Sequence, residues 1–491
     1  MTLQSLQTAL ALPEIFVASM ASAILLLGLF INQDRNDIVC FWLSVFTLLA
    51  TCVLIVSDFS AQSAFAFNGL FVDDPMGDLL KVAICLLSAT IFIYSRQYNQ
   101  DRNIFKNEYY VLGLFAVCGM MVMASANHLL TLYLGLELMS LCLYSMIAFF
   151  RDDKLAVEAA MKYFVLGALA SSVLLYGMSL LYGLTGSLEL AVISSVVANM
   201  GQDNLALAPA LSLAVVFIVV ALAFKIGAVP FHMWIPDVYH GAATSTTAFI
   251  GAAPKIAAFA LVMRLLVGGL EDLHEQWQQM LIILALLSVA VGNVIAIAQD
   301  NLKRMLAYST ISHMGFFLFG ILAGSAAGYS ASLFYILIYA TMSCAAFGLI
   351  LYWSTKDFES DQLNDLKGLS KRSPWTALLF LILMFSMAGV PPTAGFFAKL
   401  SVIQALIDAH LEWVAIVAVV LAVIGAYYYL RIIKLIYFDA PQTMPEADAP
   451  TPVQSDRKIV LAINVIIIIA ILPWIGTLIT LCNRVIKQFV Y

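Results

Sequence analysis

The sequence predicts an all-α polytopic membrane protein with about fourteen transmembrane helices, arranged as two inverted five-helix repeats that each contain one broken helix. Three observations lead to this fold class. The chain is apolar along nearly its whole length, its basic residues gather in alternate loops, and two apolar segments are too long for one membrane crossing. Each of these long segments also contains glycine and proline near its middle.

The composition excludes a soluble protein. Hydrophobic residues make up 63% of the 491 positions and charged residues only 11%, whereas soluble domains are roughly half apolar and about a quarter charged. Apolar runs of about 18 residues or more indicate helices, since the strands of a membrane β-barrel are short and alternate in polarity. No basic run lies beside aromatic residues, so the chain carries no signature of nucleic-acid binding.

A hydropathy window of about 20 residues divides the chain into five regions. Residues 1–108 hold three helices, 109–267 form the first repeat, 277–438 form the second and inverted repeat, 439–456 are an acidic, proline-rich mobile cytoplasmic loop, and 457–491 carry the last helix. No basic residue precedes the first apolar run, so we expect a retained helix there and not a cleaved signal peptide. The expected spans are 12–31, 38–57, 73–95, 109–126, 128–150, 156–183, 206–239, 243–267, 277–298, 302–323, 328–354, 375–408, 410–438 and 457–482.

The basic residues predict the orientation, because the cytoplasmic loops of membrane proteins are enriched in lysine and arginine. Sixteen of the 24 basic residues fall in the loops on one side of the membrane. The loops 58–72 and 184–205 on the opposite side contain none. We therefore expect both termini on the outer side.

The two overlong spans, 206–239 and 375–408, predict broken helices. Each has 34 residues, or about 51 Å as a straight helix, against a hydrocarbon core of about 30 Å. They contain related interruptions, FKIGAVPFHMWIPD from residue 224 and FSMAGVPPTAGFFAKLSVI from residue 385. They are the seventh and twelfth spans, so an odd number of crossings separates them and the second unit is inverted. Broken helices at corresponding places in inverted repeats mark an ion path, since irregular backbone within a membrane can line a hydrated cavity.

Ionisable residues lie inside the expected spans. Lys225 and Lys399 are close to the two interruptions, Lys255 is in the middle of the span 243–267, and Lys162 is in the span 156–183. Glu137 lies roughly 14 Å deep in the span 128–150. No basic residue is found within one turn of it, so its partner must come from another helix, and Lys162 is the expected candidate. The alternative interpretation is structural, with these lysines in fixed ion pairs or hydrated.

The chemistry of such a row suits proton transfer. Burial disfavours the charged form of an amine and a nearby carboxylate favours it, so a buried amine can gain and release a proton as its partner moves. His232, two residues after Pro230, can assist. Ionisable residues within a membrane are candidates for function by default. The seven cysteines include no C-x-x-C pair, which favours helix packing over a metal or iron–sulfur site.

This set of residues, with breaks in the seventh and twelfth spans, resembles the antiporter-like subunits of respiratory complex I and of Mrp-type cation/proton antiporters. The resemblance covers nearly the whole chain. It implies that Glu137 and Lys162 form a coupling pair and that Lys225 is the central relay of the first half. It further implies that Lys255 links the halves and that Lys399 occupies the terminal position of the second channel.

Two histidines complete the candidate set. His232 matches a connecting position of the family pattern. His313, in YSTISHMGFF, is a further candidate, and a buried, hydrogen-bonded histidine of purely structural role is an equally good interpretation. The lysine in GVPPTAGFFAKLSVI, together with the chain length, favours a member of the complex I branch of the family.

The resemblance implies a proton-pumping module of a larger redox enzyme in the bacterial inner membrane, driven by quinone reduction elsewhere, with both termini periplasmic. It implies no cofactor in this chain, and NAD, FMN, iron–sulfur clusters and quinone in partner subunits. The implied neighbours are the antiporter-like subunits M and L, the small subunits K and J, and the lipid bilayer. The chain itself shows no Rossmann glycine pattern and no pair of facing histidines for haem. Two alternatives stay open, namely a subunit of an Mrp-type cation/proton antiporter and a structural membrane scaffold.

Overall fold

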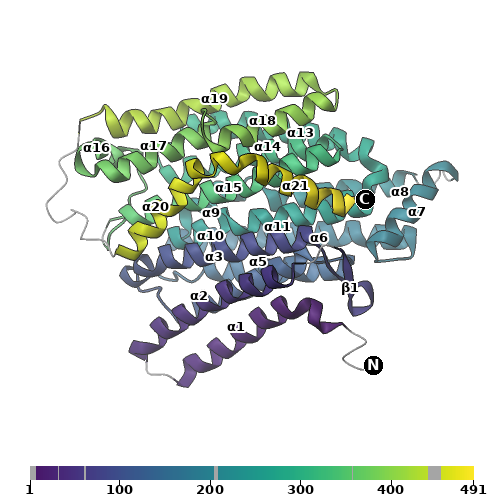
Figure 1. The fold of residues 1–491 in the computed structure, drawn as a ribbon, viewed down its shortest axis with the longest axis horizontal. Helices are drawn as coiled ribbons and strands as arrows, with labels where there is room; N and C mark the ends of the chain where they lie inside the picture. Colours follow the sequence, from purple (N-terminus) through teal and green to yellow (C-terminus); the bar gives the residue numbers. More distant parts are fainter. Residues whose placement is uncertain are drawn as a thin grey trace.

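The protein was analysed as a computed structural model that describes residues 7–30, 33–59, 62–203, 208–356, 358–440 and 455–490. It is a bundle of long helices that lie nearly along one common axis, which is horizontal in Figure 1. Within the described ranges, eleven helices are long and apolar enough to cross a membrane, or twelve if a bent C-terminal pair is one span. The predicted class, an all-α polytopic membrane protein, is confirmed.

The N-terminal region and the first half contain most of the helices that surround the first break. A two-stranded antiparallel hairpin, in which Ala64 pairs with Asp73, precedes the third helix. The elements are α1 (Leu12–Phe30), α2 (Gln33–Ser57), β1 (Ala64–Ala66), β2 (Phe71–Asp73), α3 (Pro75–Asp101), α4 (Asn107–Ala124), α5 (Leu129–Ile147), α6 (Lys154–Thr185), α7 (Leu190–Asp203), α8 (Ala208–Ile226), α9 (Trp234–Gly241), α10 (Thr244–Gly251), α11 (Ala253–Val262) and α12 (Gly268–Leu270).

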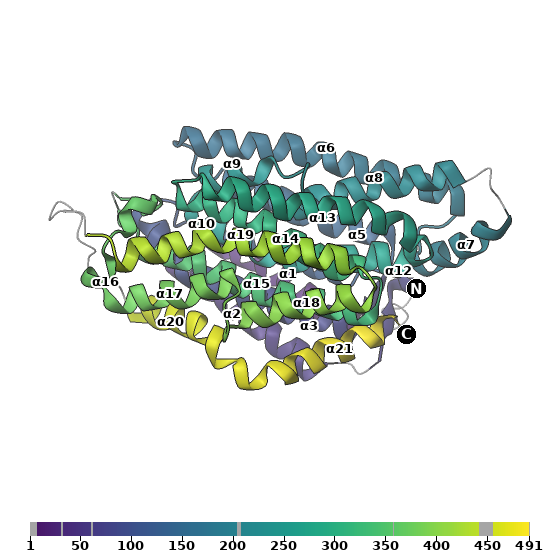
Figure 2. The same cartoon turned by 90° about the horizontal axis from the view of Figure 1, so that it is seen from above.

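The second half and the C-terminal region contain the second break and a bent last span. Figure 2 shows α20 and α21 along the side of the bundle that is opposite to α6. The elements are α13 (His274–Ile297), α14 (Leu302–Leu322), α15 (Ala326–Trp353), α16 (Leu369–Arg372), α17 (Pro374–Ala388), α18 (Ala394–Asp408), α19 (Glu412–Tyr437), α20 (Ser455–Ala470) and α21 (Ile475–Val490).

The number of spans differs from the predicted fourteen because some predicted spans are joined into one helix and others are divided into short helices. The predicted spans 243–267 and 277–298 run together as one helical stretch of 54 residues, Thr244–Ile297, although the chain turns back between them (Figure 2). The second broken span, predicted as 375–408, is divided into α17 and α18. Each has 15 residues and is too short to cross the membrane alone. The last span bends by 50° at its break. The count of fourteen therefore stays a prediction, and the helix α7 was not expected from the sequence.

The two halves repeat each other in detail. A Cβ added to Gly119 of α4 would lie 2.6 Å from Met139 N of α5, and one added to Gly292 of α13 would lie 2.7 Å from Ser312 N of α14. Glycine is required at both places because the two backbones approach so closely. The predicted order of spans places an odd number of crossings between α4 and α13, so we expect this hairpin to run opposite to the hairpin of α4 and α5.

The offset in residue number that relates Gly119 to Gly292 also relates further features of the two hairpins. His128 caps the N-terminus of α5 and forms a backbone bridge with Glu189, while Asn301 caps the N-terminus of α14 and forms a bridge with Gln362. Both cap side chains accept a hydrogen bond from a backbone N–H in the first turn of their helix, which otherwise lacks a partner. This shared register allows the two halves to be compared residue by residue.

Candidate proton-transfer site

The first break lies between α8 and α9, and its turn is built around Gly227. This glycine has a φ of +88°, a left-handed conformation that other residues avoid. The N–H groups of Gly227 and Ala228 both donate to Ala223 O, at 2.8 and 2.7 Å, and thereby cap the end of α8. The carbonyl of Ile226, the last residue of the helix, needs a donor from elsewhere. Lys255 Nζ of α11 supplies it at 2.9 Å.

The second break, between α17 and α18, has the same construction. Gly389 has a φ of +86°, and its N–H and that of the next residue donate to Phe385 O at 3.0 and 2.9 Å. The last two carbonyls of α17 again receive a lysine. Lys399 Nζ donates to Met387 O at 3.1 Å and to Ala388 O at 2.8 Å.

Lys255 and Lys399 therefore occupy equivalent places, although they come from different elements. Each ammonium group lies against the carbonyl end of a helix, where the helix dipole favours a cation. Each also lies over an aromatic ring, with Lys255 Nζ 5.3 Å from the centroid of Trp234 and Lys399 Nζ 5.4 Å from that of Phe316. The break supplies the polar groups that make a buried ammonium tolerable in an apolar bundle.

The structure corrects the register in which the two interruptions were compared. Matching the Val-Pro pairs places Val229 opposite Val390. The structures instead match at the two left-handed glycines, Gly227 and Gly389, which shifts the alignment by one residue. In the structural register Lys225 lies opposite Met387, and Lys399 lies opposite Asp237. Lys225 and Lys399 are thus not counterparts, even though both lie near a break.

Lys225, in the last turn of α8, points toward α5. Its Nζ donates to Ser140 Oγ at 3.1 Å. Glu137, one turn earlier on α5, is the carboxylate that exerts an attractive electrostatic effect on this ammonium. One carboxylate oxygen of Glu137 is buried and has no hydrogen-bond partner among the described residues. The structure thus brings Lys225 close to the acid that sequence reasoning had assigned to Lys162.

The expected ion pair between Glu137 and Lys162 is wrong. Lys162 Nζ lies 2.7 Å from Asp237 Oδ2 of α9 and 2.7 Å from Glu158 Oε1 of its own helix, and its side chain is 42% exposed. Asp237 also binds Arg304 of α14 at 3.2 Å, so this carboxylate joins the two halves. Glu158 could have been found from its i, i+4 spacing to Lys162. The partnership with Asp237 is long-range and has no local sequence signal.

His232 lies in the turn between α8 and α9 and is partly buried. In the part of the chain that the structure describes, it forms no hydrogen bond or ion pair with Lys225 or Lys255. Its place at the mouth of the break agrees with the expected location. Its connecting role stays a prediction.

His313 is buried within the second half, where two tyrosines hold its ring. Its Nδ1 lies 2.6 Å from Tyr335 Oη and its Nε2 lies 3.1 Å from Tyr429 Oη. The charge of Lys399 acts on this imidazole. In the shared register of the hairpins, His313 is the counterpart of Ser140, which is the residue that accepts from the lysine of the first half. The tyrosine partners could not be recognised from the sequence.

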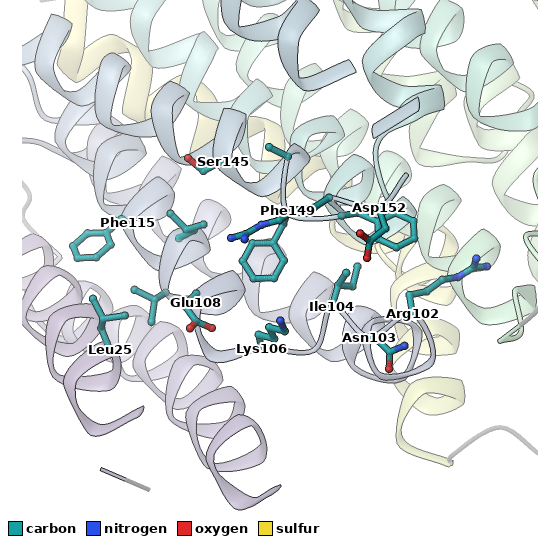
Figure 3. Close-up of a pocket in the computed structure, with 15 residues that line it drawn as sticks. Leu25, Arg102, Asn103, Ile104, Lys106, Glu108, Phe115, Ser145, Phe149 and Asp152 are labelled. Carbon is teal, nitrogen blue, oxygen red and sulfur yellow. The ribbon is translucent and has the colours of Figure 1, made fainter. Parts of the chain in front are cut away.

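A small cavity lies between the two lysines of the first half. It is lined by Lys225, Lys255, Tyr163 and Trp234 among others, and its volume of about 20 Å³ is enough for a single water molecule. A larger cavity, about 800 Å³, opens between the ends of α1, α4 and α5, where Lys106 and Glu108 lie at its rim (Figure 3). None of the candidate relay residues lines the larger cavity.

Interrupted helices in two inverted halves, each with a buried or half-buried lysine on the free carbonyls of the break, define the class of antiporter-like membrane subunits. The family described as "NADH:quinone oxidoreductase/Mrp antiporter, TM" matches residues 126–425. The chain is 55% identical over 477 residues to "NADH-quinone oxidoreductase subunit N" of Thioalkalivibrio sulfidiphilus, with 97% of this chain and 98% of the relative covered. The protein of the same name from Thiobacillus denitrificans is 53% identical, with 96% of each chain covered.

Solved structures agree with these relatives. A chain of "Respiratory complex I from Thermus thermophilus with bound Aureothin" superposes with a TM-score of 0.80 at 30% identity, covering 95% of this chain and 98% of that one. A chain of the "Mrp complex from Dietzia sp. DQ12-45-1b" superposes with a TM-score of 0.83 at 22% identity, covering 99% and 98%, which shows a shared fold alone. The chain belongs to the family of NADH-quinone oxidoreductase subunit N, and the resemblance found from the sequence is confirmed.

Proposed function

We propose that this chain is a proton-translocating membrane subunit of an NADH:quinone oxidoreductase in the bacterial inner membrane. Support comes from the relatives, which carry this name over nearly the full length of the chain, and from the likeness to a chain of a respiratory complex I. Its partners are the other membrane subunits of that complex, with the antiporter-like subunits M and L and the small subunits K and J as the proposed neighbours. Both termini face the periplasm.

The observation that carries the proposal is the placement of ionisable groups at both helix breaks. Lys225 donates to Ser140 and is attracted by the charge of Glu137, and a cavity with room for one water molecule is lined by both Lys225 and Lys255. Lys399 occupies the second break. Charges that are removed from water cost up to several kcal/mol each, so a row of buried and half-buried charges in an apolar bundle points to a role in moving charge.

In the proposed relay, a proton passes along this row when the partners of a lysine change. A lysine that leaves the carbonyls of its break loses favourable interactions with its charged form, and it releases a proton through water to the next acceptor. Lys162 and His232 act at the entrance of the first half, and His313 acts beside Lys399. The chain supplies no redox chemistry, and NAD, FMN, iron–sulfur clusters and quinone belong to partner subunits.

The replacement Glu137→Gln tests the proposal, since it removes one charge and keeps the shape of the side chain. In the assembled complex, we expect proton uptake into reconstituted vesicles to fall by about tenfold or more, as is typical when an acid–base group is lost. NADH-to-quinone turnover should fall with it. The control is Glu412→Gln, an exposed carboxylate at the start of α19. Full pumping by the Glu137 variant would remove this residue from the relay.

A cation/proton antiporter subunit of an Mrp-type complex is the second candidate, because its members share this fold. The two functions differ in their partners. Purification from native membranes should yield NADH-oxidising subunits with this chain if the first proposal is correct. A complex that lacks them and exchanges sodium for protons would support the second.

A further inference from the structure

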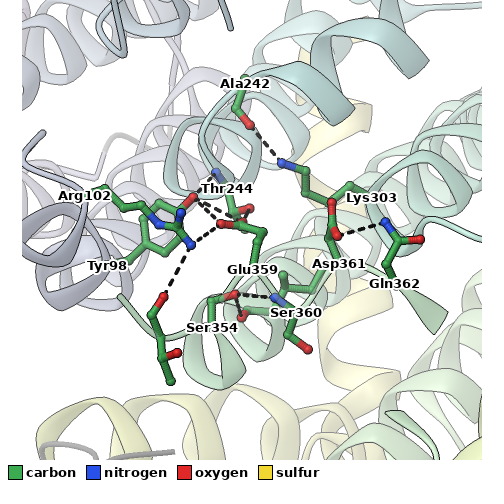
Figure 4. Close-up of polar contacts among 12 residues, drawn as sticks. Tyr98, Arg102, Ala242, Thr244, Lys303, Ser354, Glu359, Ser360, Asp361 and Gln362 are labelled. Carbon is green, nitrogen blue, oxygen red and sulfur yellow. Dashed lines mark hydrogen bonds and ion pairs between the residues drawn. The ribbon is translucent and has the colours of Figure 1, made fainter. Parts of the chain in front are cut away.

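The segment between α15 and α17 reaches across to the first half of the bundle through Glu359. Glu359 Oε2 lies 2.6 Å from Arg102 Nη2, just past the end of α3, and Tyr98 Oη donates to the same carboxylate at 3.0 Å (Figure 4). Thr244, the first residue of α10, donates its hydroxyl to Glu359 Oε1. One carboxylate thus joins three elements that are far apart in the sequence.

This carboxylate lies at the N-terminus of α10, where it holds the Tyr98 hydroxyl that caps the helix. The N–H of Thr244 donates to Tyr98 Oη at 3.2 Å, and Tyr98 in turn donates to Glu359. The first N–H groups of a helix have no partner within the helix, and the helix dipole favours a negative charge there. The side chain of Thr244 is fully buried, so without these contacts its polar groups would lack partners.

The joint between α9 and α10 is held from its other side as well. Lys303, in the first turn of α14, donates to Ala242 O at 3.0 Å, just past the end of α9 and two residues before α10 (Figure 4). Lys303 and Glu359 both belong to the second half of the chain, whereas the joint belongs to the first. The second half therefore fixes the point at which the first half passes from its broken helix to the next span.

The segment that carries Glu359 is itself anchored, so its carboxylate is held in place. Arg102 Nη2 donates to Thr355 O at 3.4 Å, and the N–H of Leu302 donates to Asp361 O. Asn301 Nδ2 donates to Asp361 Oδ2 at 2.7 Å. These contacts, made by the described residues 354–356 and 358–366, tie the segment to both α3 and α14.

The helix that is capped in this way leads directly to Lys255. The segment α10 ends at Gly251, the backbone bends at Ala252, and Lys255 lies in the first turn of α11. A shift of the start of α10 would therefore move the lysine that donates to the first break. The distance from Lys255 to Ile226 O depends on where this joint is held.

We infer that Glu359 is a positioning residue, which holds the joint before α10 and through it sets the placement of Lys255 on the first break. The inference rests on the proposed function only for its consequence in pumping. It does not require Glu359 to carry a proton. Through the segment after α15, the placement of Lys255 in the first half then depends on the structure of the second half.

The test compares Glu359→Gln with Asp300→Asn in the assembled complex. The side chain of Asp300 forms an ion pair of 2.7 Å with Arg431, and its only bond to the described residues of the segment of Glu359, from the N–H of Leu363, goes to its backbone carbonyl, which the substitution keeps. Amide hydrogen exchange of peptides from 242–255 should be about tenfold faster in the Glu359 variant, the effect of losing a charge-assisted hydrogen bond. It should be unchanged in the Asp300 variant. Equal exchange in the Glu359 variant and the parent would overturn the inference, whatever the pumping rate.

A second measurement addresses the consequence for pumping. The number of protons taken up per NADH oxidised should fall in Glu359→Gln, whereas a merely structural contact would lower only the yield of complex. Faster exchange with an unchanged ratio would overturn the link to Lys255. If the Glu359 variant fails to assemble, Tyr98→Phe and Thr244→Val replace it, because each removes one hydroxyl and leaves the ion pair with Arg102 intact. The same two outcomes then decide.

Discussion

Replacement of Lys399 separates a proton carrier from a helix cap. The ammonium group donates to two carbonyls at the end of α17, so its removal could act through either role. Lys399→Met removes both the donor and the proton, whereas Lys399→Gln removes the titrating group and keeps an amide that can donate. Lys434→Met, at an exposed lysine of α19, is the matched control.

The size of the structural effect follows from the contacts. Hydrogen bonds from a charged donor contribute about 1.5–3 kcal/mol each, so the two bonds set an upper limit of about 6 kcal/mol for Lys399→Met. The variant also removes a half-buried charge, whose desolvation costs up to several kcal/mol. The two terms oppose each other, and we expect a net loss of stability below about 3 kcal/mol. The glutamine variant should lose less.

Pumping should respond differently from stability. If Lys399 carries protons, both variants should lower proton uptake by about tenfold or more. The assay measures NADH oxidation and proton uptake in the same vesicles, and thermal dissociation of the purified complex provides the stability. Normal pumping by Lys399→Gln beside defective pumping by Lys399→Met would refute the relay and leave Lys399 as a helix cap.

Three further predictions concern the first break and the orientation. Lys225→Arg should fail nearly as badly as Lys225→Ala in coupled turnover, because arginine does not release its proton; rescue by arginine would indicate a fixed cation. Gly227→Ala should destabilise the complex by about 2–5 kcal/mol, the combined effect of a left-handed alanine and overpacking, since its Cβ would lie 1.9 Å from a side chain; Gly183→Ala, with open space around it, should leave thermal dissociation unchanged. A cysteine at Lys371 should react with an impermeant thiol reagent in inside-out vesicles and one at Glu189 in right-side-out vesicles, and the reverse pattern would invert the predicted topology.

The sequence predicted the features of the fold that depend on local pattern. Long apolar runs, the two interruptions and the buried lysines are all visible in the chain itself, because each follows from spacing or composition. The hairpin of β1 and β2 and the helix α7 were missed, since hydropathy does not resolve short elements outside the apolar spans. The predicted count of fourteen spans was not confirmed, because a bent or divided helix satisfies the hydropathy pattern without being one continuous helix.

The partners of the site residues were harder to predict. Glu137 was matched to Lys162 of the next span because no basic residue lies within one turn of Glu137, but α9 brings Asp237 to Lys162 and α8 brings Lys225 close to Glu137. Such pairings depend on how helices pack, which periodicity does not record. The same is true of Ser140, whose hydroxyl carried no signal of its own.

Because the two halves share one register, equivalent positions can be compared within a single chain, which a protein without a repeat does not allow. Gly119 and Gly292 agree because close helix contact leaves no choice of residue at either place. Ser140 and His313 disagree although they occupy the same position, so the scaffold tolerates both and each half is free to set its own proton affinity there. Exchanging these two side chains between the halves would transplant the titrating group, but an imidazole would have to fit where a serine is buried, and a void would remain where the histidine was removed. A duplicated bundle can thus tune two conduction steps independently within one chain.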